Sequence, residues 1–128
     1  MPATIINTTS DKFLADIQHI VATNSDKKIY AYFYGHHTEE TGKSWCPDCV
    51  RSDPIVFERF AKADNNVVLV SVDAGDRATW KDPAHHLRHN KDTRLVGIPT
   101  LLRWNHFDQR IEDESIEKTE VLDKFLSL

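Results

Sequence analysis

The two cysteines of this chain lie three residues apart, and this spacing limits the chemistry open to them. Cys46 and Cys49 are the only cysteines among 128 residues, within the segment Trp45-Cys46-Pro47-Asp48-Cys49. Two thiols at this spacing can pair as a disulfide, bind a metal ion, or exchange electrons with another sulfur. The element that holds them decides between these uses.

Residues 50–60 predict a helix that begins at the first cysteine. Cys46 is then the N-cap and Pro47 the first helical residue, where proline is well tolerated. The unpaired N–H groups and the positive dipole end of a helix start favour a thiolate. We therefore expect Cys46 to be an exposed nucleophile. Cys49, one turn later on the same face, is expected to be a partly buried resolving thiol.

A zinc site is the less favoured use of these cysteines. Cys-Pro-x-Cys also occurs in zinc knuckles, and His36 and His37 lie a few residues upstream. A structural zinc site needs four ligands, usually from two paired elements, and the chain has no second Cys-x-x-Cys. Two unrelated buried cysteines are disfavoured by the spacing. We expect no metal ligand among the site residues.

Four residues beside the cysteines are expected to tune or shield them. The charge of Asp48 opposes a thiolate at Cys46, although a carboxylate at this position also interacts well with the helix dipole. Lys43 could offset that charge, so Pro47, Asp48 and Lys43 are candidates for setting the redox potential. Trp45 is expected to shield the nucleophile and to offer an apolar platform to a substrate.

The remaining segments predict one α/β domain over residues 1–128. Strands are expected at 29–34, 67–72, 100–104 and 109–112, and helices at 13–21, at 83–90 and around 121–126. A threonine or serine at 9–10 can cap the first helix, and 35–44 and 76–79 read as loops. This order suits a central mixed sheet with helices on both faces.

Composition excludes several classes of function. Sixteen Lys and Arg against twenty Asp and Glu give a net charge of −4, without the basic patch of a nucleic-acid-binding protein. No apolar run is long enough to span a membrane, and no export signal is recognisable. A single Cys-x-x-Cys without an export signal suits a reducing compartment, so we expect a cytoplasmic protein.

Several segments together resemble the thioredoxin superfamily. Besides the WCPDC segment these are Ala31-Tyr32-Phe33-Tyr34-Gly35, Trp80-Lys81-Asp82-Pro83 and residues 96–102. WCPDC is similar to the branch of small cytosolic thioredoxin-related proteins of about 14 kDa, also called Clot-type. The resemblance implies the thioredoxin fold. It also implies a cis peptide bond before Pro99, facing the cysteines, and a backbone at Ile98 that pairs with an extended substrate.

The resemblance also implies an activity. It is that of a dithiol–disulfide oxidoreductase whose redox group is a Cys46–Cys49 disulfide, with no bound cofactor. Thioredoxin reductase and NADPH would restore the dithiol, and the substrates would be small or selected disulfides, with peroxide removal as a side activity. Without a third cysteine we expect a monomer. The alternative is a redox-sensing interaction module in signalling.

One position departs from thioredoxin. Matching the strands places Tyr32 where thioredoxin carries a buried aspartate. The group that takes the proton from Cys49 is therefore left open between water, Asp48 and another residue.

Overall fold

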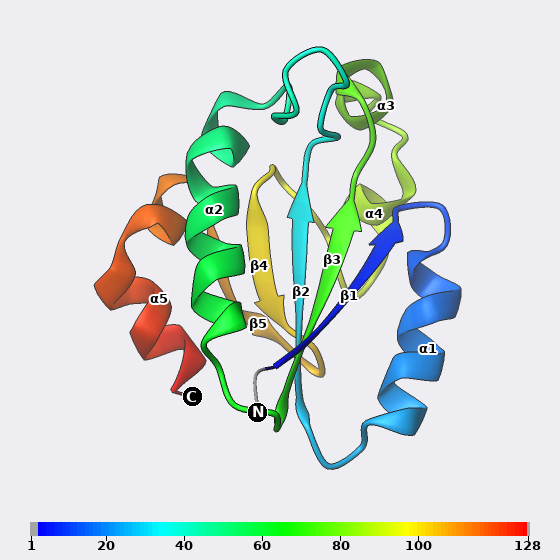
Figure 1. Cartoon of the computed structure of the whole chain (residues 1–128). Helices are drawn as coiled ribbons and strands as arrows, with labels where there is room; N and C mark the ends of the chain where they lie inside the picture. The colour runs from blue at the N-terminus through cyan, green and yellow to red at the C-terminus, as the bar shows by residue number, and fades with distance from the viewer. Residues whose placement is uncertain (1–2, 128) are drawn as a thin grey trace.

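A five-stranded mixed sheet forms the centre of the structure, a computed structural model that describes residues 3–127 (Figure 1). The strands are β1 (Thr4–Thr9), β2 (Lys28–Tyr34), β3 (Val67–Asp73), β4 (Thr100–Arg103) and β5 (His106–Glu112). Their order across the sheet is β1-β3-β2-β4-β5. β1, β3 and β2 run parallel, whereas β4 and β5 pair antiparallel. The predicted mixed sheet is confirmed.

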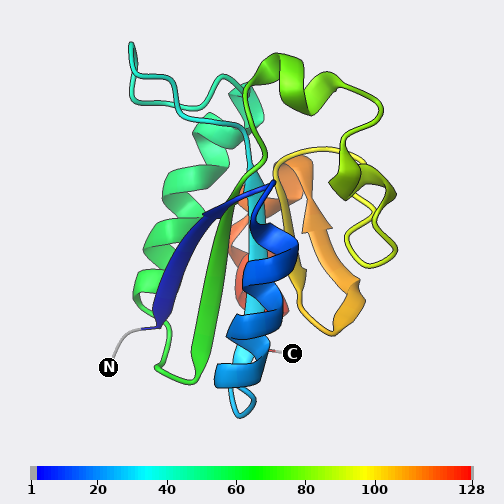
Figure 2. The same cartoon turned by 90° about the vertical axis from the view of Figure 1, so that its right-hand side faces the viewer.

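Helices cover both faces of this sheet, as the sequence predicts (Figures 1 and 2). They are α1 (Phe13–Thr23), α2 (Pro47–Ala61), α3 (Arg77–Lys81), α4 (His86–His89), the 3₁₀ helix η1 (Asp113–Glu117) and α5 (Thr119–Leu126). α2 and α5 pack on one face, and α1 packs on the other together with residues of α3 and α4.

β2 separates the two halves of the core. Its side chains alternate between the faces, as in any strand. Tyr30 and Tyr32 point into the cluster under α2 and α5, and Ala31 and Phe33 point into the cluster under α1. All four are 0% exposed. Because β2 is buried on both faces, it fixes where the chain enters the loop at residues 35–44, and hence where the cysteines lie.

Three elements of the structure were not predicted from the sequence. β1 is one edge strand of the sheet and was overlooked because only Ile5 and Ile6 mark it as apolar. α3 forms where we expected a loop, because the side chain of Asp76 caps it by accepting the amide N–H of Thr79 at 2.8 Å. η1 was not predicted either.

Several boundaries also differ from the expectation. The N-cap of α1 is Lys12, without a side-chain hydrogen bond, so neither Thr9 nor Ser10 caps this helix. α4 begins at His86 instead of at Pro83. The turn between β4 and β5 consists of Trp104 and Asn105, and it is short because Asn105 adopts a positive φ of 71°.

The ends of the fold lie far from the cysteine loop. Figures 1 and 2 show that β1 starts and α5 ends at one end of the molecule, while the loop at residues 35–44 projects from the other. The redox segment therefore lies at the end of the sheet where the parallel strand β2 finishes.

We predict that packing of α2 against the sheet dominates stability. Phe60 on α2 is 0% exposed and contacts the ring of Tyr30 edge-on at 5.4 Å between ring centroids. Phe60→Ala should lower the free energy of unfolding by about 3–5 kcal/mol in urea titration, because it leaves a cavity. Val96→Ala is the control, since Val96 is 79% exposed. It should change stability by less than about 0.5 kcal/mol, and equal losses in both variants would contradict this packing.

Candidate active site

The first turn of α2 is built around the sulfur of Cys46. Cys46 is the N-cap with extended backbone angles (φ −88°, ψ 115°), and Pro47 is the first helical residue, as predicted. The Cys46 Sγ accepts the amide N–H of Cys49 at 3.3 Å. Sulfur thus occupies the place that a serine or aspartate oxygen takes in an ordinary N-cap.

The loop before the helix is tied to the end of β2. The amide N–H of Cys46 donates to Ser44 Oγ at 3.1 Å, and that hydroxyl donates to the carbonyl of Gly35 at 2.8 Å. A side chain at position 35 would come within 2.9 Å of both Ser44 and the indole of Trp45. Glycine is therefore required for this close approach.

Both thiols are more buried than the sequence indicated. Cys49 is 0% exposed and Cys46 only 6% exposed, and both thiols are free. The expectation of an exposed Cys46 is wrong because Ser44, Trp45 and Ile98 surround it. Only a small part of Cys46 is therefore accessible to a partner sulfur.

The two thiols differ strongly in acidity. The pKa of Cys46 is lowered to about 7, chiefly by its hydrogen bond with Cys49, against the opposing effect of burial. The amide of Cys49 lowers this pKa further, whereas the charge of Asp48 raises it. The pKa of Cys49 is raised by the hydrogen bond to Cys46 and then by burial. Near neutral pH a large share of Cys46 is therefore thiolate, whereas Cys49 keeps its proton.

The charge of Asp48 is paired with an arginine that sequence reasoning missed. Asp48 forms an ion pair with Arg51, one turn later on α2, and Arg51 Nε also contacts Glu117 Oε1 at 3.1 Å. Lys43 lies exposed in the loop. Arg51 therefore occupies the position beside Asp48 that we had expected for Lys43. The spacing Asp48–Arg51 (i, i+3) was a signal that could have identified it.

Two other segments meet at the cysteines. The Cys46 thiol donates to the carbonyl of Ile98 at 3.8 Å, and the Ile98–Pro99 peptide bond is cis, the form that the resemblance implied. Trp45 is half-buried, and its indole Nε1 donates to the carbonyl of Gly75 at 2.9 Å. The structure thus brings Trp45, Ile98 and Pro99 to the same site as the two cysteines.

Sequence reasoning missed a buried carboxylate, that of Asp53. Its Oδ1 accepts the hydroxyl of Tyr32 at 2.5 Å, and its Oδ2 lies 2.7 Å from Nε2 of His37. Tyr32 Oη also lies 2.6 Å from Ser52 Oγ. Burial raises the pKa of Asp53, although both hydrogen bonds oppose this effect. Asp53 follows Cys49 by four residues, which places it on the same helix face.

The histidines do not form the zinc site considered above. His36 Nδ1 lies 2.6 Å from Asp73 Oδ2, and His37 is bound to Asp53, so both are turned to carboxylates. Within residues 3–127 no group of three or more His, Cys, Asp or Glu could hold a metal ion.

The histidines at the two ends of α4, His85 and His89, differ in their exposure. His89 is exposed, but His85 is buried against Trp80, and its Nε2 lies 3.1 Å from the carbonyl of Ala74. His85 is also the N-cap of α4, where its side chain accepts the amide N–H of Leu87.

The fold and the site define a protein of the thioredoxin class, with a Cys-x-x-Cys at the start of a helix. A solved structure of reduced thioredoxin from Schistosoma mansoni matches with a TM-score of 0.63, covering 98% of each chain at 16% identity. That likeness concerns the fold. No helix within residues 3–127 is long and apolar enough to cross a membrane.

Comparison with proteins of similar sequence identifies the family of this chain. It belongs to the family described as thioredoxin domain-containing protein 17-like, whose thioredoxin-domain model matches residues 8–128. The Clot protein of Arabidopsis thaliana is 40% identical over 65% of this chain and 62% of its own length, so the match spans less than two thirds of that relative. Thioredoxin domain-containing protein 17 of Homo sapiens is 32% identical over 80% of each chain. This membership supports a thioredoxin-like redox function.

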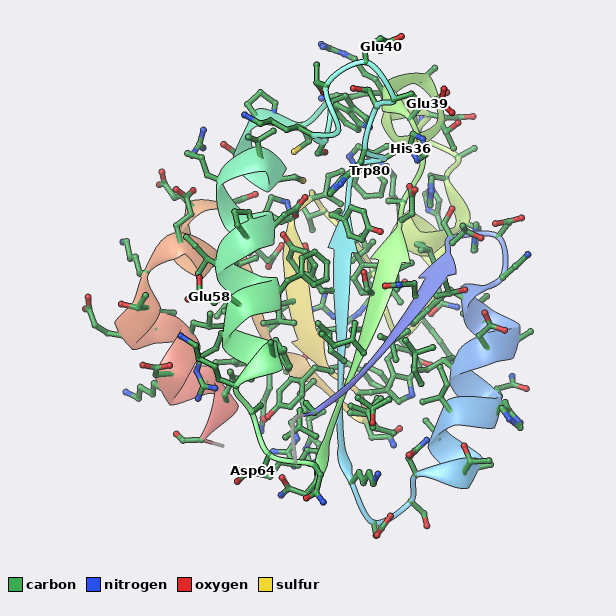
Figure 3. The ribbon with its side chains drawn as sticks, viewed as in Figure 1. His36, Glu39, Glu40, Glu58, Asp64 and Trp80 are labelled. Atoms are coloured by element: carbon green, nitrogen blue, oxygen red, sulfur yellow. The ribbon has the colours of Figure 1, made fainter. Side chains whose placement is uncertain are left out.

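We predict that Asp48 lowers the reactivity of Cys46. Asp48→Asn removes the charge that raises the Cys46 pKa, so the midpoint should move below that of the Cys49→Ser form that keeps Asp48. The rate of alkylation by iodoacetamide, followed against pH with Cys49 replaced by serine in every form, measures that midpoint. Glu58→Gln is the control, because Glu58 lies exposed on the outer side of α2 (Figure 3). A midpoint that rises or stays fixed in Asp48→Asn would contradict this role.

Proposed function

We propose that this protein is a dithiol–disulfide oxidoreductase in which Cys46 attacks and Cys49 resolves. The observation that carries the proposal is the geometry of the pair: at the start of α2 the Cys46 Sγ accepts the amide N–H of Cys49 at 3.3 Å, and the Cys49 thiol lies buried one turn later. The lowered pKa of Cys46 and the raised pKa of Cys49 agree with these roles. Attack requires a thiolate, and resolution requires a second thiol nearby. The two requirements are met within one turn of α2.

The reaction proceeds in two exchanges. The Cys46 thiolate attacks a substrate disulfide, forms a mixed disulfide and expels the first substrate sulfur as a thiolate. Cys49 then loses its proton and attacks Cys46, which forms the Cys46–Cys49 disulfide and expels the second sulfur. Thioredoxin reductase, with electrons from NADPH, returns the pair to the dithiol, and no other cofactor is needed.

Restricted access supports small or selected disulfides as substrates. Cys46 is only 6% exposed, and the loop at residues 35–44 rises beside it with Glu39 and Glu40 at its tip (Figure 3). A compact disulfide such as cystine can reach a sulfur with so little exposed surface, whereas a disulfide inside a folded protein must first be presented on an extended segment. Trp45 offers the apolar contact, and the backbone at Ile98 and Pro99 offers strand-like pairing.

The same thiolate supports a peroxidase side activity. Attack of Cys46 on a peroxide oxygen gives a sulfenic acid and an alcohol or water. Cys49 then displaces water and forms the same disulfide. We propose that these reactions take place in the cytoplasm and that the protein acts as a monomer.

We predict that the two cysteine variants fail at different steps. With thioredoxin reductase, NADPH and cystine, the wild-type protein should sustain NADPH oxidation, and Cys46→Ser should reduce it to background because no thiolate remains. Cys49→Ser should form a mixed disulfide that it cannot resolve, seen as a mass increase of one half-cystine. Thermal melts check that both variants fold.

Two outcomes would contradict the proposal. Full turnover by Cys46→Ser would overturn the assignment of the nucleophile. A wild-type protein that cycles between thiol and disulfide without turning over any substrate would favour the redox-sensing interaction module instead. Insulin in place of cystine tests the selectivity, and an equal rate on both would remove the restricted-access explanation.

A further inference from the structure

The resolving step needs a base, because Cys49 must lose its proton before it attacks. Cys49 is 0% exposed, so bulk water does not touch its sulfur. Asp48, one candidate left open by the sequence, has a side chain 47% exposed and is paired with Arg51. Tyr32 occupies the strand position at which thioredoxin carries a buried aspartate. Its hydroxyl is engaged by Asp53 and Ser52.

Asp53 is the one buried carboxylate within residues 3–127. It is 5% exposed and lies four residues after Cys49, so that the two side chains leave α2 on the same face, with Cβ atoms about 5–6 Å apart. The charge of Asp53 also acts on Cys49 directly, since it is among the groups that raise the pKa of that thiol. A carboxylate one helical turn from a buried thiol that must be deprotonated can act as its base, directly or through one water.

The carboxylate is held in place and connected to solvent. Tyr32 from β2 and His37 from the loop each take one of its oxygens, at 2.5 and 2.7 Å. The side chain of His37 is 41% exposed. A surface cavity of about 400 Å³ reaches the carboxylate between the loop and α2, and its lining includes His37, Lys43, Ser44, Val50, Asp53 and Phe57. A proton on Asp53 can therefore pass to solvent through this cavity.

We propose that Asp53 accepts the thiol proton of Cys49 in the resolving step, an inference that rests on the proposed function. The proton moves from Cys49 Sγ to the Asp53 carboxylate. The sulfur electron pair of Cys49 forms the bond to Cys46 Sγ, and the bond from Cys46 to the substrate sulfur breaks. The substrate leaves as a thiolate, and the protonated Asp53 returns its proton to solvent on the side of His37.

The titratable groups around Asp53 determine the pH range in which it can act. They are Cys49 on its own helix, Tyr32 and Tyr34 on β2, and His37 in the loop. Burial raises the pKa of Asp53 above its ordinary value and that of both tyrosines as well, so the tyrosines stay neutral near pH 7. A raised pKa brings the carboxylate closer to the operating pH, which makes it a better proton acceptor.

The same shift indicates that the test variant will fold. A group whose pKa is raised in the folded state contributes its stability at low pH, below the unfolded pKa. That contribution is lost as the pH rises through the folded pKa. An ionised Asp53 therefore adds no stability at neutral pH. Asp53→Asn keeps an oxygen that can accept the Tyr32 hydroxyl and should fold, which a thermal melt checks.

The test separates the two sulfur exchanges with dithiobis(nitrobenzoate), whose product thiolate is coloured. Mixing excess reagent with the reduced protein releases one equivalent of thiolate when Cys46 attacks and a second when Cys49 resolves. The first phase accelerates with reagent concentration and the second does not. In Asp53→Asn the first phase should keep the wild-type rate. The second should slow by roughly tenfold to a hundredfold at pH 7, because the base is gone.

The pH profile distinguishes a lost base from a disturbed structure. The share of Cys49 that is already ionised rises with pH and needs no base, so the defect in Asp53→Asn should shrink steadily as the pH rises, and Asp53→Glu should recover part of the rate. Glu58→Gln, which removes an exposed carboxylate from the same helix, should leave both phases unchanged. In the wild type, the second phase should fall as acid protonates Asp53.

Each outcome decides one question. If the wild type releases no second equivalent, Cys49 does not resolve and the proposed function itself fails. If the wild type releases both equivalents and Asp53→Asn does so at the same rate, only the role of Asp53 is overturned. A defect of equal size at every pH would also overturn it, since a structural effect would not depend on the ionisation of Cys49.

Discussion

One contact, the hydrogen bond from the Cys49 amide to the Cys46 sulfur at 3.3 Å, determines how the rest of the site is arranged. Because the nucleophile is also the helix cap, its charge is stabilised by the turn that it starts. The same turn directs Cys49 inward and, four residues further on, places Asp53 against Tyr32 on β2. Sulfur chemistry and helix geometry therefore cannot be changed independently in this protein.

The sheet provides the fixed frame for this contact. β2 is buried on both faces and ends just before the loop, so the entry point of α2 is set by the core. On the other side of the sulfur, the carbonyl of Ile98 accepts a hydrogen bond from the Cys46 thiol. The nucleophile thus lies between the start of α2 and the segment around Ile98, about fifty residues later in the sequence. Its low exposure results from the contact between these two segments.

The sequence predicted well what is local and strongly patterned. The cysteine spacing, Pro47 at the helix start and the apolar runs of β2 and β3 predicted their elements, and the family resemblance supplied the fold. The buried position of Asp53 was not predicted, because its partners Tyr32 and His37 are 21 and 16 residues away in sequence. One signal was available: an aspartate on the same helix face as Cys49, Val56 and Phe60, which are all buried. Exposure of Cys46 was misjudged because it depends on Ile98, which no local pattern connects to it.

The distance between the dithiol and both ends of the fold has a practical consequence. β1 begins at Thr4 and α5 finishes at Leu126 on the side of the molecule away from the loop (Figure 1). A fluorescent protein, affinity tag or second domain fused at either end would emerge behind the reactive surface. The molecule therefore lends itself to tethering, for example on a sensor chip or within a genetically encoded redox probe, with its sulfurs facing outward.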